Sequence, residues 1–176
     1  EEIFDPFCGI GTILQEALLM GYLALGVDKE IRPARKNLEW LEQKYPRVKG
    51  RWQTFEGDAT DLRKFKVIEA VVTEPYLGPF HHGLPSTQEA EQIAEELRIL
   101  YRKTLMELAK KVTGKVIIIF PELKTRNKEV VSLDMPLVIS RSGFKIFSPL
   151  PKIKVPIPYI DKKDKINRYI YILQKK

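Results

Sequence analysis

The sequence has very few of the residues from which metal centres and disulfide frameworks are built. Its 176 residues include one cysteine, Cys8, and two histidines, His81 and His82. A single cysteine excludes an intramolecular disulfide and a cysteine-rich zinc site. The histidine pair supplies too few ligands for a metal, since no further ligand has suitable spacing nearby. We therefore expect no metal, and the histidines are either solvated loop residues or contacts to a substrate.

Long apolar runs are also missing from the sequence. The longest runs, such as residues 116–120, have the length of a strand, so neither a signal peptide nor a membrane span is expected. A cytoplasmic protein without a membrane partner is the simplest interpretation. The chain is nevertheless 44% hydrophobic, and at this length that content is enough for the full core of one domain over residues 1–176.

The most informative stretch is Asp5-Pro6-Phe7-Cys8-Gly9-Ile10-Gly11-Thr12, a turn between an apolar strand and an amphipathic helix. Gly9 and Gly11 have no Cβ, so the backbone there can turn tightly and lie against a ligand. Thr12 and Gln15 have the spacing of a capping box, which predicts that Thr12 caps the helix. The order strand, glycine turn and helix is typical of a nucleotide-type pocket.

Asp28 lies 19 residues beyond Gly9, directly after the apolar run 22–27. A carboxylate at the end of a strand would accept hydrogen bonds from ribose hydroxyls. The turn holds only two glycines and no lysine, so it lacks the third glycine of the dinucleotide fingerprint and the lysine of a P-loop. Both absences favour a nucleoside ligand without phosphates.

The eight-residue string DPFCGIGT resembles motif I of class I S-adenosylmethionine-dependent methyltransferases. The particular residues resemble the form of this motif in the RNA-methylase group, which includes the THUMP-associated tRNA guanine-N2 methyltransferases. The resemblance implies an enzyme of the EC 2.1.1 class that uses S-adenosyl-L-methionine to methylate an exocyclic base amine, guanine N2, of tRNA. It implies that Asp28 holds the ribose, and that the methionine end of the cofactor is cradled by Asp5, Cys8, Gly9, Gly11 and Thr12.

A second motif, Gly57-Asp58-Ala59, follows a predicted third strand at residues 51–56. The resemblance implies that Asp58 contacts the adenine amino group and that Ala59 lies beside the adenine ring. A simple capping role for Asp58, at the start of the short segment through Leu62, is the alternative. The position after the third strand favours the cofactor role.

A third motif, Thr73-Glu74-Pro75-Tyr76, follows a predicted fourth strand at residues 67–72. Enzymes of the resembled group that methylate amines carry Asp/Asn-Pro-Pro-Tyr/Phe here, so Pro75 and Tyr76 match while Thr73 and Glu74 depart. An aromatic amine is a poor nucleophile, and an acceptor must bond its N–H and orient its lone pair. Thr73 or Glu74 would be that acceptor, and Tyr76 would stack on the base. The alternatives are a solvated carboxylate and a packed loop aromatic.

Positive charge is concentrated at the C-terminal end of the sequence. Residues 141–176 hold ten basic and two acidic side chains, whereas the other 140 residues hold 20 basic and 21 acidic ones. Such a surface suits the phosphate backbone of a nucleic acid, which the resemblance implies is tRNA, although a solubilising lysine-rich end is the alternative. Four prolines predict that residues 150–160 form an extended arm between two strands.

The remaining elements complete an alternation of strands and helices. We expect a long helix from Ser86 to Gly114, a strand at 115–120, an irregular helix at 126–140 interrupted by Pro136, and strands at 144–148 and 167–173. The fold class is therefore α/β, with helices on both faces of a mostly parallel sheet and the ligand at the carboxyl ends of its strands. The resemblance specifies a Rossmann-like class I methyltransferase sheet of seven strands whose last strand is antiparallel.

The chain opens without methionine and almost directly in its first strand. In the resembled family a helix and a substrate-binding domain precede motif I, so we expect the C-terminal part of a longer protein whose N-terminal RNA-binding domain is absent here. Three alternatives stay open. They are a DNA adenine-N6 or cytosine-N4 methyltransferase, a catalytically weak cofactor- or RNA-binding module, and a nicotinamide oxidoreductase, which the two-glycine turn disfavours.

Overall fold

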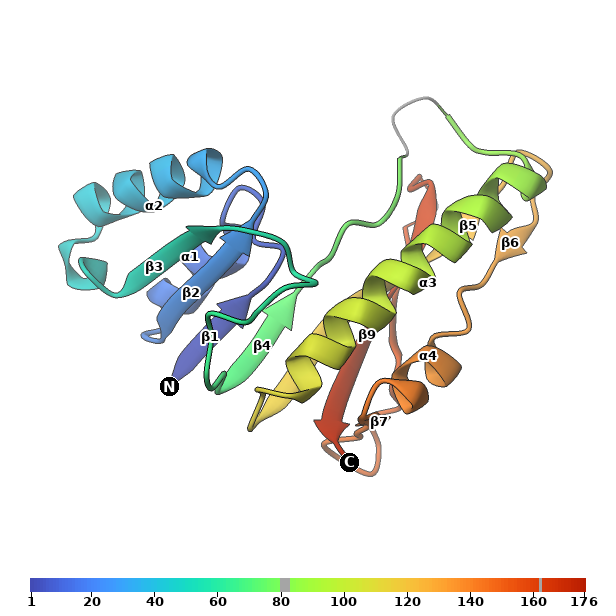
Figure 1. Cartoon of the computed structure of the whole chain (residues 1–176). Helices are drawn as coiled ribbons and strands as arrows, with labels where there is room; N and C mark the ends of the chain where they lie inside the picture. Colours follow the sequence, from blue (N-terminus) through green and yellow to red (C-terminus); the bar gives the residue numbers. More distant parts are fainter. Residues whose placement is uncertain (80–82, 162) are drawn as a thin grey trace.

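A mixed β-sheet with the strand order β3-β2-β1-β4-β5-β9-β7 forms the centre of the molecule (Figure 1). The computed structural model describes residues 1–79, 83–161 and 163–176. Five strands run parallel to one another: β1 (Glu2–Asp5), β2 (Leu23–Asp28), β3 (Trp52–Glu56), β4 (Ala70–Thr73) and β5 (Lys115–Lys124). The long β9 (Ile166–Lys175) is antiparallel to both of its neighbours, β5 and β7 (Phe144–Ile146). The predicted seven-stranded, mostly parallel sheet with an antiparallel C-terminal strand is confirmed.

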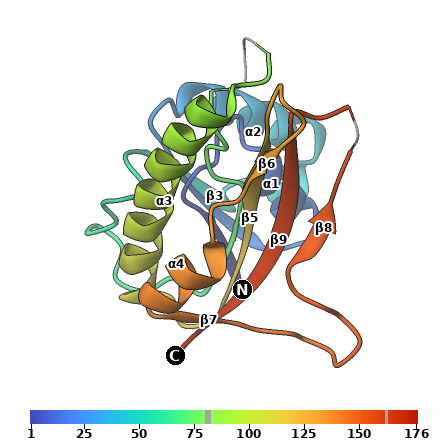
Figure 2. The ribbon, with the colours of Figure 1, turned by 90° about the vertical axis from the view of Figure 1, so that its right-hand side faces the viewer.

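Helices cover both faces of this sheet, as predicted. The helices α1 (Thr12–Leu19) and α2 (Arg32–Lys44) pack over β1, β2 and β3, and a short 3-10 turn, η1 (Pro46–Val48), follows α2. The helices α3 (Thr87–Ala109) and α4 (Met135–Arg141) form the other layer (Figures 1 and 2). Each layer has its own buried apolar cluster, because successive strand side chains point to opposite faces.

The longest helix, α3, begins where the sequence predicts. The Ser86 side chain accepts a hydrogen bond from the Glu89 backbone N–H, and the Glu89 side chain accepts one from the Ser86 backbone N–H, which completes a capping box. The helix ends at Ala109, before Gly114. Gly114 has a different role: a Cβ there would lie 2.3 Å from the carbonyl oxygen of Glu69, so only glycine permits this approach between the segments that lead into β4 and β5.

Three local predictions are wrong. Thr12 does not cap α1, because Gly11 is the N-cap with a φ of 88° and no side chain caps the helix. Residues 126–140 are not one irregular helix but a turn, the short strand β6 (Val130–Val131) and α4. Pro136 lies in the first turn of α4, where a missing N–H costs no hydrogen bond, so it starts this helix and does not interrupt one. The fourth strand begins at Ala70, not at Val67.

The predicted extended arm, residues 150–160, contains no helix and ends in the short strand β8 (Ile157–Tyr159). β8 pairs with β9 in antiparallel register, outside the main strand order. Figure 2 shows the arm leaving the bottom of the sheet near β7 and returning beside β9. The turn that joins β8 to β9 therefore lies at the edge where β5 ends, since Ile166 pairs with Leu123.

Candidate active site

A cleft of about 420 Å³ opens at the carboxyl ends of four neighbouring parallel strands. This is the edge at which parallel α/β sheets bind their ligands, and the volume lies in the range of small-molecule sites. Each strand contributes residues at or just beyond its carboxyl end, and α3 contributes one side chain. The lining consists of Pro6, Phe7 and Gly9 after β1; Asp28, the last residue of β2, with Lys29; Gly57, Asp58 and Ala59 after β3; Glu74, Pro75 and Tyr76 after β4; and Leu100 of α3.

Backbone amides hold the Asp28 carboxylate. The Gly9 N–H donates to Oδ2 at 2.8 Å and the Glu30 N–H donates to Oδ1 at 3.0 Å. Gly9 has a φ of 51°, in the left-handed region that favours glycine. A carboxylate accepts about four hydrogen bonds, so each oxygen retains capacity for one more donor. The arrangement can therefore bind a pair of neighbouring hydroxyl groups.

Asp58 is held at the next strand end by Thr60 and Lys29. Its Oδ1 accepts hydrogen bonds from the Thr60 backbone N–H at 2.8 Å and from the Thr60 hydroxyl at 2.7 Å, and the Lys29 ammonium lies 3.0 Å from Oδ2. The backbone hydrogen bond from Thr60 is the main cause that lowers the pKa of Asp58. Asp58 is therefore an ionised acceptor in the cleft, beside Ala59. It also organises the local turn, so the two roles proposed for it are compatible.

Asp5 and Thr73 lie beneath the cleft and not in its lining. Both are 1% exposed. The Thr73 hydroxyl donates to Asp5 Oδ1 at 2.6 Å, and the Phe7 N–H donates to the same oxygen at 3.0 Å. Burial raises the pKa of Asp5 to about 7, against the opposing effect of the Thr73 hydrogen bond. This buried pair joins the end of β1 to the end of β4. The Thr73 hydroxyl, a candidate acceptor for the target amine, is therefore engaged with Asp5 and buried.

Cys8, Gly11 and Thr12 also lie away from the cleft lining. Cys8 is among the residues predicted to cradle the cofactor, but its side chain does not line the cleft: it is 4% exposed and belongs to the apolar cluster under α1 and α2. Its Sγ lies 2.9 Å from where a Cβ on Gly26 would be, so the turn directs the thiol into the core. Burial raises the pKa of Cys8 to about 12. Gly11 is buried against Ala34, and Thr12 is exposed at the start of α1.

Glu74 is the acceptor candidate that lies in the cleft. The Arg168 Nε donates to Glu74 Oε1 at 3.0 Å, and the Arg168 Nη1 donates to Asp164 Oδ2 at 2.6 Å. The Tyr76 side chain is half exposed beside it, and the Tyr76 carbonyl accepts a hydrogen bond at 2.6 Å from the hydroxyl of Tyr101 in α3. The structure thus brings together Asp28, Asp58, Ala59 and the Glu74 to Tyr76 segment, as the sequence predicts.

Two residues that support the cleft, Arg168 and Tyr101, are not predicted from the sequence. They lie 94 and 25 residues from the groups that they contact. Nothing in the local sequence marks Arg168, which was counted only as one cation of the basic segment. Tyr101 is buried in α3, and burial raises the pKa of its hydroxyl, which keeps it a neutral donor.

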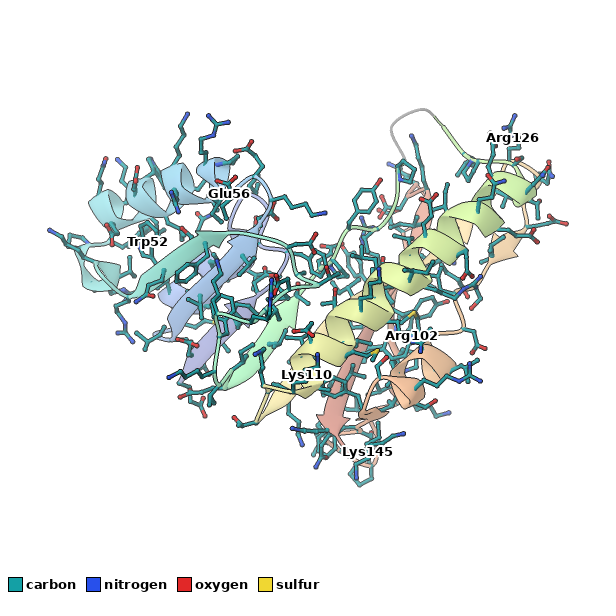
Figure 3. The ribbon with its side chains drawn as sticks, viewed as in Figure 1. Trp52, Glu56, Arg102, Lys110, Arg126 and Lys145 are labelled. Carbon is teal, nitrogen blue, oxygen red and sulfur yellow. The ribbon has the colours of Figure 1, made fainter. Side chains whose placement is uncertain are left out.

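The basic segment does not form a single surface. Lys163 is exposed in the turn between β8 and β9, at the edge of the sheet that carries the cleft. Lys145 in β7 lies at the opposite edge, because it pairs with Gln174, which in turn pairs with the first residue of β5. Figure 3 shows Lys145 near the bottom of the view, far from Glu56 at the end of β3. Lys162 lies outside the described residues.

Within residues 1–79, 83–161 and 163–176, no group of three or more His, Cys, Asp or Glu side chains is arranged to hold a metal ion. His81 and His82 lie outside the described residues, so their role stays a prediction. No helix in the described part of the chain has the length and apolarity required to cross a membrane.

Two curated proteins are related to the chain in sequence. A tRNA (guanine(10)-N2)-dimethyltransferase of Pyrococcus abyssi is 29% identical over 179 residues, which cover 98% of this chain and 44% of that protein. A protein of the same name from Methanothermobacter thermautotrophicus is 40% identical over 78 residues, which cover 44% of this chain and 22% of that protein. The chain thus spans less than half the length of these relatives. No family model matches the chain.

Solved structures share the fold. TrmN from Thermus thermophilus superimposes with a TM-score of 0.65 and 16% identity, covering 99% of this chain and 44% of that chain. Magnesium protoporphyrin IX methyltransferase (ChlM) from Synechocystis PCC 6803, solved with bound SAM, has a TM-score of 0.62 and 12% identity, covering 99% of this chain and 69% of that chain. The Rossmann-like class I methyltransferase fold is confirmed, and so is the relationship to tRNA guanine-N2 methyltransferases.

Proposed function

We propose that this chain, with its class I methyltransferase fold and its relatives among tRNA dimethyltransferases, transfers a methyl group from S-adenosyl-L-methionine to an exocyclic amine of tRNA, guanine N2. The observation that carries the proposal is the convergence of Asp28, Asp58 and Glu74 with Tyr76 on one cleft at the carboxyl ends of β2, β3 and β4. Sequence similarity over 98% of the chain to a tRNA (guanine(10)-N2)-dimethyltransferase supports the substrate class.

The cleft fits the chemistry of this cofactor. Asp28 offers free acceptor capacity on both oxygens for the two ribose hydroxyls, and the ionised Asp58 beside Ala59 offers an acceptor for an adenine amino group. Of the described residues in the lining, Lys29 alone is basic, and it is paired with Asp58. The lining therefore favours a nucleoside ligand over a phosphate-bearing one. The cofactor would supply an activated methyl group on a sulfonium.

The residues after β4 would present the target amine. Glu74 accepts the amine N–H, which localises the nitrogen lone pair and turns it toward the methyl group, and Tyr76 stacks on the base. After transfer the methylated nitrogen carries an extra proton, and Glu74 or water accepts it. Thr73 does not take this role, because its hydroxyl is buried on Asp5. It holds the motif in place from below.

The tRNA would contact the edge of the sheet that carries the cleft. Lys163 stands exposed in the β8–β9 turn, one residue from Asp164, which is itself connected through Arg168 to Glu74. Phosphate contacts there would place the base near the cleft and would be sensitive to salt. Lys145 and Lys175 lie at the far edge and would contribute little to the same contact.

A calorimetric titration of the chain with S-adenosyl-L-methionine, with NAD as the control, tests the cofactor assignment. We expect micromolar affinity for S-adenosyl-L-methionine (about −8 kcal/mol) and none for NAD. Incubation of the intact protein with unmodified tRNA transcripts, followed by nucleoside analysis, should then detect N2-methylated guanosine. Tight NAD binding would overturn the proposal in favour of an oxidoreductase, and methylated adenosine or cytidine in DNA would favour the DNA-methyltransferase alternative.

One specific observation favours a second candidate, a cofactor- or RNA-binding module without turnover. The motif after β4 places its first side chain, Thr73, under the floor of the cleft and not in it. In a module of this kind the chain would bind S-adenosyl-L-methionine or tRNA, and no methylated nucleoside would form even with the intact protein.

A further inference from the structure

Glu74 is not a free carboxylate at the cleft wall. Its Oε1 accepts a hydrogen bond from Arg168 Nε at 3.0 Å, and within the described residues its Oε2 has no protein partner. The Glu74 side chain is 41% exposed, whereas that of Arg168 is 25% exposed. Among the described residues, one oxygen is therefore fixed by the protein and the other is open to a ligand in the cleft.

The guanidinium group of Arg168 bridges two carboxylates with different nitrogens. Nε binds Glu74 and Nη1 binds Asp164 at 2.6 Å. These are charge-assisted hydrogen bonds, and the planar group fixes the angle between them. A lysine ammonium on a flexible stem could neutralise one partner but would not impose this geometry on both.

The bridge is anchored in the turn between β8 and β9. Asp164 belongs to this turn, and the Lys124 ammonium at the end of β5 donates to the carbonyls of Asp161 and Asp164 at 2.9 and 2.8 Å. Arg168 itself lies in β9 opposite Pro121 of β5, so the sheet holds its backbone. A chain of contacts therefore runs from the basic turn around Lys163 to the cleft carboxylate.

We propose that Arg168 is a positioning residue for methyl transfer: it holds the Glu74 carboxylate with Oε2 directed to the target amine, and Asp164 holds Arg168. This inference rests on the proposed function. It separates Arg168 from the other cations of residues 141–176, because its guanidinium is committed to two carboxylates and does not serve as a phosphate contact. It also assigns to the β8–β9 turn a role in supporting the acceptor.

A double-mutant cycle on the intact protein tests this inference. Single-turnover methyl transfer is measured at saturating S-adenosyl-L-methionine and unmodified tRNA transcripts for wild type, Arg168→Gln, Glu74→Gln and the double variant. We expect Arg168→Gln to lower the rate about tenfold and Glu74→Gln about 100-fold, and we expect Arg168→Gln to have no further effect when Glu74 is already glutamine. The affinity for S-adenosyl-L-methionine should stay unchanged in all four proteins.

Two further variants keep the test independent of folding. Arg168→Lys should recover part of the rate, because it retains a charge beside Glu74, and Lys152→Gln in the exposed arm is the matched control for loss of one positive charge. Each variant is first compared with wild type by thermal unfolding. If Arg168→Gln unfolds, the cycle is run with Arg168→Lys.

The outcomes distinguish the inference from the function on which it rests. Equal fractional losses from Arg168→Gln in the presence and absence of Glu74 would overturn the positioning role. Weaker tRNA binding with a smaller salt slope and an unchanged rate at saturation would make Arg168 a phosphate contact and would overturn it as well. A wild-type protein that binds S-adenosyl-L-methionine but methylates no tRNA would overturn the proposed function and, with it, the inference.

Discussion

The two sides of the cleft hold their carboxylates by different means. On the side of β2 and β3, Asp28 accepts hydrogen bonds from two backbone amides, and Asp58 accepts one from a backbone amide together with contacts from the Thr60 hydroxyl and the Lys29 ammonium. On the side of β4, Glu74 is held by the side chain of Arg168, which comes from β9 and is held in turn by Asp164. A backbone amide stays in place as long as the sheet is folded, whereas a side-chain bridge can be altered by one substitution or by movement of its turn. Holding by backbone amides suits a cofactor that binds in the same way in every catalytic cycle. Holding by a side-chain bridge suits a macromolecular substrate that contacts the β8–β9 turn.

The largest effect is expected from the β4 side. Glu74→Gln keeps the size of the side chain and removes its charge, so we expect methyl transfer to fall about 100-fold, at the lower end of the range for general acid–base groups, with unchanged affinity for S-adenosyl-L-methionine. Single-turnover assays and calorimetry measure the two quantities. Asp61→Asn, which removes an exposed carboxylate paired with Arg63, is the control and should be silent. Wild-type rates in Glu74→Gln would remove the distinction between the two sides of the cleft.

The buried Asp5–Thr73 pair lies beneath both sides of the cleft. We expect it to affect the free energy of unfolding and not the affinity for S-adenosyl-L-methionine. Burial raises the pKa of Asp5 from 3.8 to about 7, so between about pH 4 and pH 7 the folded state binds more protons than the unfolded state. Stability is therefore lost as the pH rises through this range. We expect wild type to lose about 3 kcal/mol more than Asp5→Asn between pH 5 and pH 8.

Urea denaturation at the two pH values measures this difference. Thr73→Val is the companion variant: without the hydrogen bond from the Thr73 hydroxyl, the pKa of Asp5 rises further and the loss of stability at high pH grows. An identical pH dependence in wild type and Asp5→Asn would show that Asp5 does not retain its proton in the folded protein.

A smaller effect, on the affinity for S-adenosyl-L-methionine, is expected from substituting Asp28, which backbone amides hold. Asp28→Ala removes the acceptor that we propose for the ribose hydroxyls, and hydrogen bonds to a charged group contribute about 1.5–3 kcal/mol, so affinity for S-adenosyl-L-methionine should fall roughly 10- to 100-fold. Calorimetry measures it. Glu30→Ala is the control, because only the backbone N–H of Glu30 contacts Asp28. Unchanged affinity in Asp28→Ala would show that the ribose assignment is wrong.

This difference between the two sides also explains how much the sequence could predict. Asp28 ends β2 and Asp58 follows β3, and both strand ends and the neighbouring glycines are visible in the sequence. Glu30 and Thr60, which donate to these carboxylates, lie two residues away, and Gly9 belongs to the conspicuous glycine turn. The alternation of strands and helices follows from the same local patterns, whereas the seven-stranded sheet with an antiparallel last strand was implied by the resemblance. The partner of Glu74 lies 94 residues away, and its position depends on the pairing of β5 with β9. No local pattern contains that register.

The wrong predictions have a similar origin. Cys8 stands in the glycine turn, but whether its side chain points to the cleft or to the core depends on the packing of Gly26 and α1 behind it. Pro136 was expected to break a helix, yet at the first turn of α4 it is compatible with helical backbone. α2 was not predicted, although Ala34, Leu38 and Leu41 form its buried face and Pro33 lies in its first turn.

The smallest predicted effect is on tRNA affinity. It tests which part of the basic segment, residues 141–176, contacts the proposed tRNA substrate. Lys163 stands at the edge of the sheet that carries the cleft and Lys145 at the opposite edge, so Lys163→Gln should weaken tRNA binding several-fold while Lys145→Gln should not. The expected change in Lys163→Gln is a reduction of the salt slope by about 1, because one phosphate contact is lost. Binding of unmodified tRNA transcripts to the intact protein at several salt concentrations measures it. Equal losses of tRNA affinity in the two variants would mean that the positive charges act through their summed long-range potential. The β8–β9 turn would then make no specific contact with the substrate.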